Sequence, residues 1–239
     1  MRTKKTLKEA AGPKATPAPR LKKSSVILVD DHPVVREGLA RVIEQEADLE
    51  VCDQAKDANE ALQKIESSQP DIAVIDVTLD GSHGIELVKD LKIRFPNLLI
   101  LMLSMHDESL YAERSLRAGA KGYIMKQQPP QELVKAIRRV LQGEVYLSEA
   151  MTRQMLYKIA GESKVRGSSP SEVLSDREFE VFELIGQVRS TSQIATLLHL
   201  SVKTVQTHRE HIKQKLSLKD GVSLVRYAVQ WGGAQKGNA

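Results

Sequence analysis

Between residues 25 and 143, short apolar runs alternate with stretches of helical periodicity. The apolar runs have the length of strands and cover residues 26–29, 49–52, 72–77, 98–103 and 122–125. The amphipathic stretches between and after them lie near residues 34–46, 58–67, 85–94, 109–118 and 131–142. This alternation predicts βαβ units, in which helices cover both faces of a five-stranded parallel sheet.

The pattern changes after residue 143. Residues 144–170 contain one moderately helical patch and a polar stretch with Gly, Ser and Pro, which is typical of a linker. Over residues 171–239 the strand pattern is absent and helices are expected near residues 176–185, 191–198, 202–216 and 222–231. A tight turn at His199 and Leu200 precedes Ser201, a good helix cap. The sequence therefore predicts a small all-α domain with a helix-turn-helix.

Composition supports a two-domain globular protein. The chain has 239 residues, of which 41% are hydrophobic and 28% are charged. The longest apolar runs are of strand length, well short of the roughly 18 residues of a membrane span. The single cysteine, Cys52, excludes an internal disulfide. We expect a cytoplasmic protein with no membrane partner.

The net charge of +4 is concentrated at the N-terminus. Residues 1–24 carry eight Lys or Arg residues against one Glu, so this segment has a charge of +7 and the remainder −3. The composition predicts a disordered basic tail. It either adds a weak, salt-sensitive attraction to DNA or serves only as a solubilising leader.

Polar residues follow the predicted strands at one edge of the sheet. Asp30 and Asp31 follow the first predicted strand, and Asp76 ends the strand IAVID at residues 72–76. Ser104 and Lys126 follow the fourth and fifth strands. Each alone has an ordinary explanation as a helix cap, a loop residue or a surface residue. Ligands of open α/β sheets bind beyond the carboxyl ends of the strands, so the set together indicates a functional site.

Phosphoryl transfer to a carboxylate requires groups of these kinds. Asp76 is the candidate nucleophile, because an aspartate can form an acyl phosphate. Asp30, Asp31 and Asp76 offer the oxygen ligands that Mg²⁺ prefers. The cation would offset the charge of the carboxylates and of the incoming phosphoryl group. Lys126 would pair with the phosphoryl oxygens, and Ser104 would donate a hydrogen bond to one of them.

On these residues, the segment 25–143 resembles the receiver domain of two-component response regulators. The resemblance implies a flavodoxin-like, doubly wound sheet and a sensor histidine kinase as phosphodonor. It implies that Tyr123 is a rotameric switch working with Ser104, and that the backbone carbonyl of Thr78 completes the metal shell. Gly84 fits the glycine at the start of the following helix. Asp80 departs from the pattern, because many receivers have proline there.

The C-terminal segment resembles the DNA-binding domain of the LuxR/NarL type. Residues 174–181 read LSDREFEV, and residues 194–216 read IATLLHLSVKTVQTHREHIKQKL. The resemblance implies a recognition helix over residues 202–216. Its candidate DNA-contacting residues are Lys203, Thr204, Gln206, Thr207, Arg209 and Lys213. A lysine is common where Gln206 stands, and glutamine pairs well with adenine, so we expect a different base preference.

We interpret the chain as a phosphorylation-dependent transcription regulator and not as an enzyme. Phosphorylation of Asp76 by a sensor kinase would control dimerisation and binding to double-stranded promoter DNA. The last helix supports a homodimer, because it has two apolar stripes and can bury only one in its own domain. One alternative is a DNA-binding regulator whose receiver serves only for dimerisation, without phosphate. Another is a Mg²⁺-dependent phosphohydrolase that works through an aspartyl phosphate.

Overall fold

Five strands form one parallel sheet, as predicted, and their order in the sheet is β2-β1-β3-β6-β7. This computed structural model describes residues 23–80, 82–160 and 169–236, so nearly all of the predicted basic tail lies outside the described residues. The strands are β1 Ser24–Val29, β2 Leu49–Ala55, β3 Ile72–Asp76, β6 Leu99–Ser104 and β7 Gly122–Met125. Every neighbouring pair in the sheet is parallel, so all five carboxyl ends lie at one edge.

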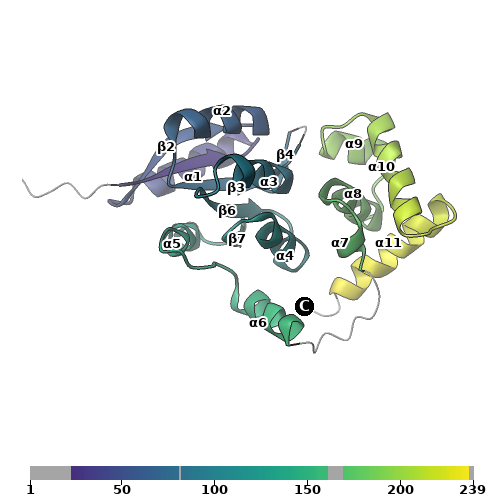
Figure 1. Cartoon of the computed structure of the whole chain (residues 1–239). Helices are drawn as coiled ribbons and strands as arrows, with labels where there is room; N and C mark the ends of the chain where they lie inside the picture. The colour runs from purple at the N-terminus through teal and green to yellow at the C-terminus, as the bar shows by residue number, and fades with distance from the viewer. Residues whose placement is uncertain (1–22, 81, 161–168, 237–239) are drawn as a thin grey trace, which may run out of the picture.

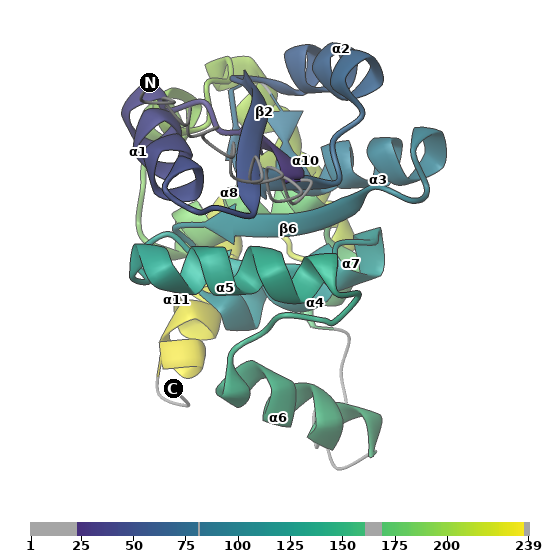
Figure 2. The ribbon, with the colours of Figure 1, turned by 90° about the vertical axis from the view of Figure 1, so that its left-hand side faces the viewer.

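Helices cover both faces of this sheet (Figures 1 and 2). They are α1 Pro33–Glu44, α2 Ala58–Ser68, α3 Gly84–Arg94, α4 Glu108–Ala118 and α5 Pro130–Leu141. Successive side chains along a strand point to opposite faces of the sheet. Val26 and Leu28 pack with residues of α1 and α5, whereas Ile27 and Val29 belong to the cluster that includes α2, α3 and α4. Both faces are therefore apolar, which explains the continuous apolar runs in the sequence.

A short antiparallel hairpin after β3 was not predicted. It consists of β4 Thr78–Leu79 and β5 Ser82–His83, and each strand is too short to give a periodic signal. The hairpin brings Gly84 back against the end of β3, where its N–H donates to the carbonyl of Val77 at 2.7 Å. A Cβ at Gly84 would lie 1.9 Å from the backbone oxygen of Asp76. Only glycine permits this approach.

The C-terminal part is helical, as expected. It contains α7 Pro170–Val173, α8 Asp176–Gly186, α9 Thr191–Leu197, α10 Val202–Lys215 and α11 Gly221–Lys236. Ser175 and Ser190 each form a capping box at the start of α8 and α9, and Ser201 caps α10. The pair α9 and α10, joined by the turn at His199, is the predicted helix-turn-helix. The helical patch expected in the linker is α6 Glu149–Ile159.

The helical domain packs beyond the carboxyl ends of the strands, with α8 facing α3 and α4 (Figure 1). The buried apolar cluster continues from one domain into the other. Tyr111 of α4 meets Phe179 of α8 edge-on, with 5.5 Å between the ring centroids. Nothing in the sequence pattern predicted this packing. Its contacts lie beside the polar edge of the sheet and bear directly on the site.

Candidate functional site

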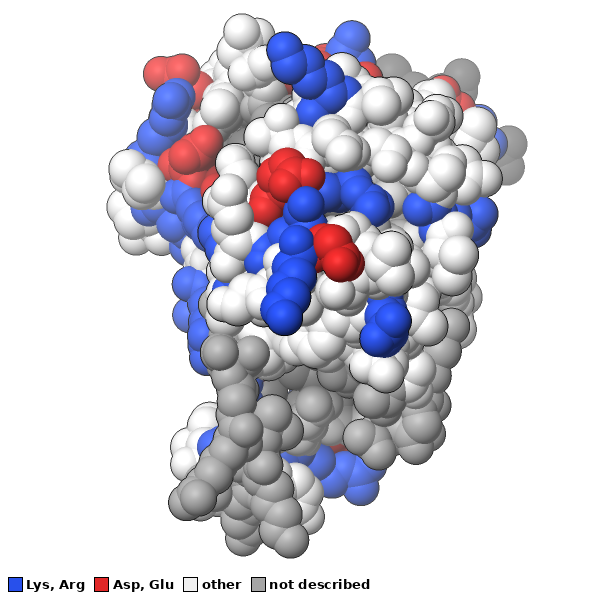
Figure 3. All heavy atoms as spheres, turned by 90° about the vertical axis from the view of Figure 1, so that its right-hand side faces the viewer, with Lys and Arg blue, Asp and Glu red and all other residues white. Residues whose placement is uncertain are grey.

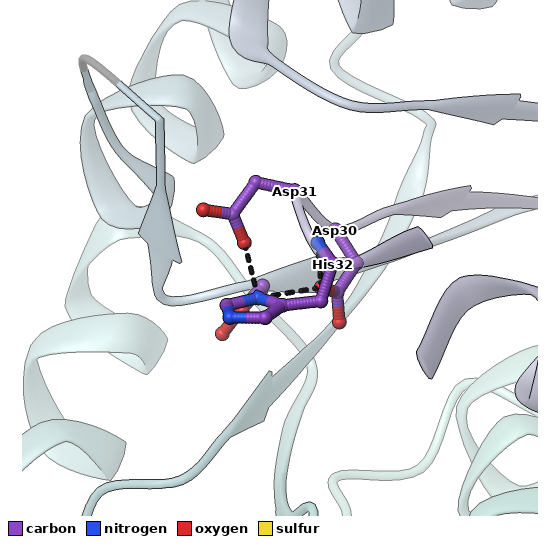
Figure 4. A group of neighbouring side chains, drawn as sticks. Asp30, Asp31 and His32 are labelled. Atoms are coloured by element: carbon purple, nitrogen blue, oxygen red, sulfur yellow. Dashed lines mark hydrogen bonds and ion pairs between the residues drawn. The ribbon is translucent and has the colours of Figure 1, made fainter. Parts of the chain in front are cut away.

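The acidic residues predicted at strand ends lie together in the structure. Asp30 follows β1 and Asp76 ends β3, and these two strands are neighbours in the sheet. Both carboxylates are buried, with exposed fractions of 2% and 4%. Ligand atoms of Asp30, Asp31, His32 and Asp76 all lie within 4.8 Å of one another. Figure 4 shows Asp31 and His32 turned toward one another beside Asp30.

Lys126 connects two of these carboxylates. Its Nζ lies 2.6 Å from Asp30 Oδ2 and 2.6 Å from Asp76 Oδ2. Burial raises the pKa of Asp76 to about 7, although the Lys126 ammonium acts in the opposite direction. The backbone N–H of Lys126 donates to the carbonyl of Ser104, which fixes the lysine next to the end of β6. The structure therefore brings Asp30, Asp76 and Lys126 into direct contact.

The carboxylate oxygens of the acidic pair suit a divalent cation. Asp30 Oδ2 and Asp31 Oδ1 are buried and have ion-pair neighbours, Lys126 and His32, but neither oxygen accepts a well-aligned hydrogen bond. Carboxylates held this close repel each other unless positive charge lies between them. Oxygen donors of this kind match the preferences of Mg²⁺ and Ca²⁺. The cluster is therefore compatible with a metal site.

Ser104 and Tyr123 are both buried next to this edge. Ser104 ends β6, and its Oγ accepts a hydrogen bond from the N–H of His106 at 3.0 Å. The hydroxyl of Tyr123, from β7, donates to the backbone carbonyl of His106 at 3.0 Å. Burial raises the pKa of Tyr123 well above its ordinary value, so the phenol stays neutral. His106 thus connects the predicted switch residues through its backbone.

Thr78 lies between the acidic site and the helical domain. Its N–H donates to Asp76 Oδ1 at 3.3 Å. Its hydroxyl donates to Glu180 Oε1 of α8 at 2.9 Å and lies 3.2 Å from His106 Nε2. The family resemblance implies a role only for the backbone carbonyl of Thr78, and no local pattern predicts the contact of its side chain with the other domain.

Three acidic residues of α8 face the receiver. Asp176, Glu180 and Glu183 are spaced by four and three residues, so they lie on one side of the helix. Asp176 pairs with Lys89 at 2.8 Å and with Arg114 at 2.6 Å. Burial alone would raise the pKa of Asp176, but these two cations hold it below the ordinary value.

Two further contacts complete this interface. Glu183 accepts a hydrogen bond from the hydroxyl of Tyr111. Arg114 also donates to the carbonyls of Ser171 and Leu174, and its guanidinium lies 4.9 Å from the ring centroid of Phe179. The three-carboxylate stripe was the available sequence signal, but an acidic helix face is usually solvated. It could not be assigned to an interface without the position of Arg114.

The candidate DNA-contacting residues lie on α10. Lys203, Thr204, Gln206 and Thr207 are exposed, and Arg209 and Lys213 are partly buried. Figure 3 views the molecule from the side of the C-terminal helices, where basic side chains outnumber acidic ones. The predicted recognition face is therefore accessible while the domains are packed together. Over the described residues, α11 and every other helix are too short or too polar to cross a membrane.

Comparison with known proteins gives consistent matches over both parts of the chain. Residues 26–138 match the family model of the response regulator receiver domain, and residues 172–228 match that of bacterial regulatory proteins of the luxR family. The oxygen regulatory protein NreC of Staphylococcus carnosus is 37% identical over 209 residues, which cover 86% of this chain and 96% of that protein. NreC of Staphylococcus aureus (strain MRSA252) gives the same identity and coverage.

Solved structures give the same result. A two-component response regulator of the LuxR family from Aurantimonas sp. SI85-9A1 is 37% identical with a TM-score of 0.55, and the match covers 58% of this chain and 99% of that one. RcsB from Salmonella enterica serovar Typhimurium was solved bound to promoter rprA in the presence of phosphomimetic BeF3−. It is 26% identical with a TM-score of 0.58, and the match covers 87% of this chain and 99% of RcsB.

Proposed function

Because this chain belongs to the luxR family of two-component response regulators, we propose that phosphorylation of Asp76 controls its binding to promoter DNA. Regulation of transcription is the function that both family matches support. The observation that carries the proposal is the contact of Lys126 Nζ with both Asp76 and Asp30, at 2.6 Å each. This contact supports the proposal, because the carboxylate proposed as nucleophile and the ammonium proposed to bind the transferred group are adjacent.

In the proposed reaction, a carboxylate oxygen of Asp76 forms a bond to the phosphorus of a kinase phosphohistidine. The phosphorus–nitrogen bond breaks, and its electron pair stays with the imidazole. Lys126, now held by two carboxylates, would donate to a phosphoryl oxygen, and the Ser104 hydroxyl would donate to another. The backbone N–H of Thr78 now donates to Asp76 Oδ1, and it would donate to the phosphoryl group once that group is attached to Asp76.

Mg²⁺ is the cofactor that we propose for this site. When bound, it supplies positive charge against the phosphoryl oxygens. Asp30, Asp31, Asp76 and the backbone carbonyl of Thr78 would hold it. The buried oxygens of Asp30 and Asp31 that lack an aligned hydrogen bond support this assignment.

Dimerisation is the step that we propose connects the receiver to DNA. The base-reading candidates on α10, Gln206 and Thr207, are exposed in the packed chain, so docking does not itself cover them. Val222 and Val229 form an exposed apolar stripe on α11, whereas Leu224 of the other stripe is buried. A second copy that covers this stripe would place two recognition helices on two half-sites of promoter DNA in the cytoplasm.

Intact-protein mass spectrometry tests the proposed chemistry. The wild-type chain and the Asp76→Asn variant are incubated with acetyl phosphate, with and without Mg²⁺. A single phosphoryl group that requires Mg²⁺ and is absent from the variant is the expected result. If the wild-type chain takes up no phosphoryl group, and Asp76→Asn binds promoter DNA as the wild type does, the receiver serves only for dimerisation.

A further inference from the structure

The contact between Thr78 and Glu180 joins the proposed phosphorylation site to the DNA-binding domain through one residue, Thr78. Thr78 donates its backbone N–H to Asp76 Oδ1 and its hydroxyl to Glu180 Oε1. The carboxylate of Glu180 is 1% exposed, so this hydrogen bond is shielded from water. A hydrogen bond to a charged acceptor in such surroundings is among the stronger ones in a protein. The position of α8 is therefore coupled to the residue beside the phosphoacceptor.

We propose that Glu180 is the positioning residue through which the docked DNA-binding domain slows phosphorylation of Asp76. This inference rests on the phosphorylation proposed above. While α8 is docked, the Glu180 carboxylate holds the Thr78 hydroxyl and places a carboxylate, partly neutralised by Arg177, beside the site that must accept a phosphoryl group. A phosphoryl group carries a charge of about −1.5 to −2, so it and the carboxylate repel each other.

The neighbours of Glu180 support a contact that can be released. Arg177 lies on the same helix, three residues earlier, and its Nη1 donates to Glu180 Oε2 at 2.6 Å. This pair moves with α8, so undocking does not leave Glu180 without a counterion. Glu180 therefore has the same counterion in the docked and in the undocked chain. The cost of release comes from the hydrogen bond from Thr78, the contacts around Asp176 and the packing of Tyr111 against Phe179.

His83 offers a second group aimed at the same carboxylate. Its Nδ1 accepts the N–H of Ile85 at 3.2 Å, so in the neutral ring the proton lies on Nε2. That Nε2 is buried, lies 4.0 Å from Glu180 Oε2 and has no hydrogen-bond partner among the described residues. A receiver residue on each side of Glu180, Thr78 and His83, thus presents a donor to it. Two receiver side chains therefore face this carboxylate, one at hydrogen-bond distance and one at 4.0 Å.

The coupling acts in both directions. If only the undocked chain is phosphorylated quickly, the observed rate is the intrinsic rate multiplied by the undocked fraction. Anything that weakens docking then raises the rate by the same factor. Conversely, a phosphoryl group on Asp76 disfavours docking, because equilibrium coupling between two sites is reciprocal. Loss of one hydrogen bond to a charged group shifts such an equilibrium about ten-fold.

The test measures the rate of phosphorylation of the full-length chain by acetyl phosphate with Mg²⁺, using intact-protein mass spectrometry. Glu180→Gln keeps an oxygen that can accept from Thr78 but replaces the charged acceptor by a neutral one, so it should react about ten-fold faster than the wild type. Thr78→Val removes the hydrogen bond itself, from the other domain, and should also accelerate the reaction. In the Thr78→Val background, Glu180→Gln should have a smaller effect than in the wild type, because the hydrogen bond that the two residues share is already absent and only the loss of charge remains. A role of Glu180 that is independent of Thr78 would keep its full effect in that background.

Glu183→Gln is the matched control, because it makes the same chemical change one turn further along α8, at a carboxyl that contacts Tyr111 and not Thr78. It should change the rate less than Glu180→Gln does. An unchanged rate in folded Glu180→Gln, or in Thr78→Val, would overturn the inference, as would an undiminished effect of Glu180→Gln in the Thr78→Val background. Failure of the wild type and all variants to take up phosphate would instead overturn the proposed function, and the inference with it.

Discussion

Arg114 makes the most extensive contact between the two domains, so its removal is a direct test of docking. The side chain is 12% exposed and donates to Asp176, with 2.6 Å between the guanidinium and Oδ1. It also donates to the carbonyls of Ser171 and Leu174, at 2.7 Å and 2.9 Å. We expect Arg114→Ala to separate the domains while leaving each one folded.

The expected loss of docking free energy depends on which charges remain near Asp176 after Arg114 is truncated. Truncating one partner of a buried ion pair costs about 3–5 kcal/mol when the other charge is left uncompensated. Here Lys89 stays 2.8 Å from Asp176 and compensates part of the loss. We therefore expect docking to weaken by about 2 kcal/mol. This corresponds to about a 30-fold shift of the docking equilibrium.

Trp231, the only tryptophan of the chain, is a suitable reporter. It packs against Phe179 and Phe182, with ring centroids 5.4 Å and 5.6 Å away, and Phe179 is the residue that meets Arg114. Undocking should make Trp231 more accessible to iodide quenching and increase the radius of gyration in small-angle X-ray scattering.

Two variants control this measurement. Arg114→Lys keeps the charge but lacks the planar guanidinium that reaches both carbonyls. Its quenching and radius of gyration should therefore lie between those of the wild type and Arg114→Ala. Arg117→Ala lies one turn further along α4, where an exposed arginine pairs with Glu113 of its own helix, so docking should be unchanged. Identical quenching and radius of gyration in Arg114→Ala and the wild type would refute the role of Arg114.

Three further predictions concern other parts of the chain. Gly84→Ala should destabilise the receiver by about 3 kcal/mol, since its Cβ would lie 1.9 Å from the backbone oxygen of Asp76; thermal unfolding measures this, and an unchanged Tm would contradict it. Gln206→Ala should weaken binding to the cognate site by about 1–3 kcal/mol and leave non-specific binding nearly unaltered in a gel-shift assay; equal losses on both DNAs would show that Gln206 reads no base. Burial raises the pKa of Glu183 from 4.5 to about 7, so its support for docking is complete below pH 4.5 and is lost as the pH rises through 7. Quenching of Trp231 should therefore increase from pH 5 to pH 8, and Glu183→Gln should reduce this dependence.

The acidic site could be predicted because a parallel sheet imposes strong constraints. Once the apolar runs are identified as parallel strands, their carboxyl ends must meet at one edge, and so must Asp30, Asp76 and Lys126. The structure agrees with this topology, since Lys126 Nζ lies 2.6 Å from both carboxylates. Capping was equally local, since Ser175 and Ser201 stand directly before their helices. The functional roles of these residues remain predictions.

The contacts between the domains could not be predicted, because they depend on a relative placement that no local pattern encodes. On an isolated helix, Asp176, Glu180 and Glu183 would form an acidic face in water and contribute little to stability. In the packed chain the same three carboxyl groups contact Arg114, Thr78 and Tyr111 of the receiver. In water these carboxyl groups contribute little to stability. When they are buried, each must be hydrogen-bonded or paired to avoid a large desolvation cost, and this requirement makes the interface specific. These polar groups regain water when the domains separate, which offsets part of the free-energy cost of undocking.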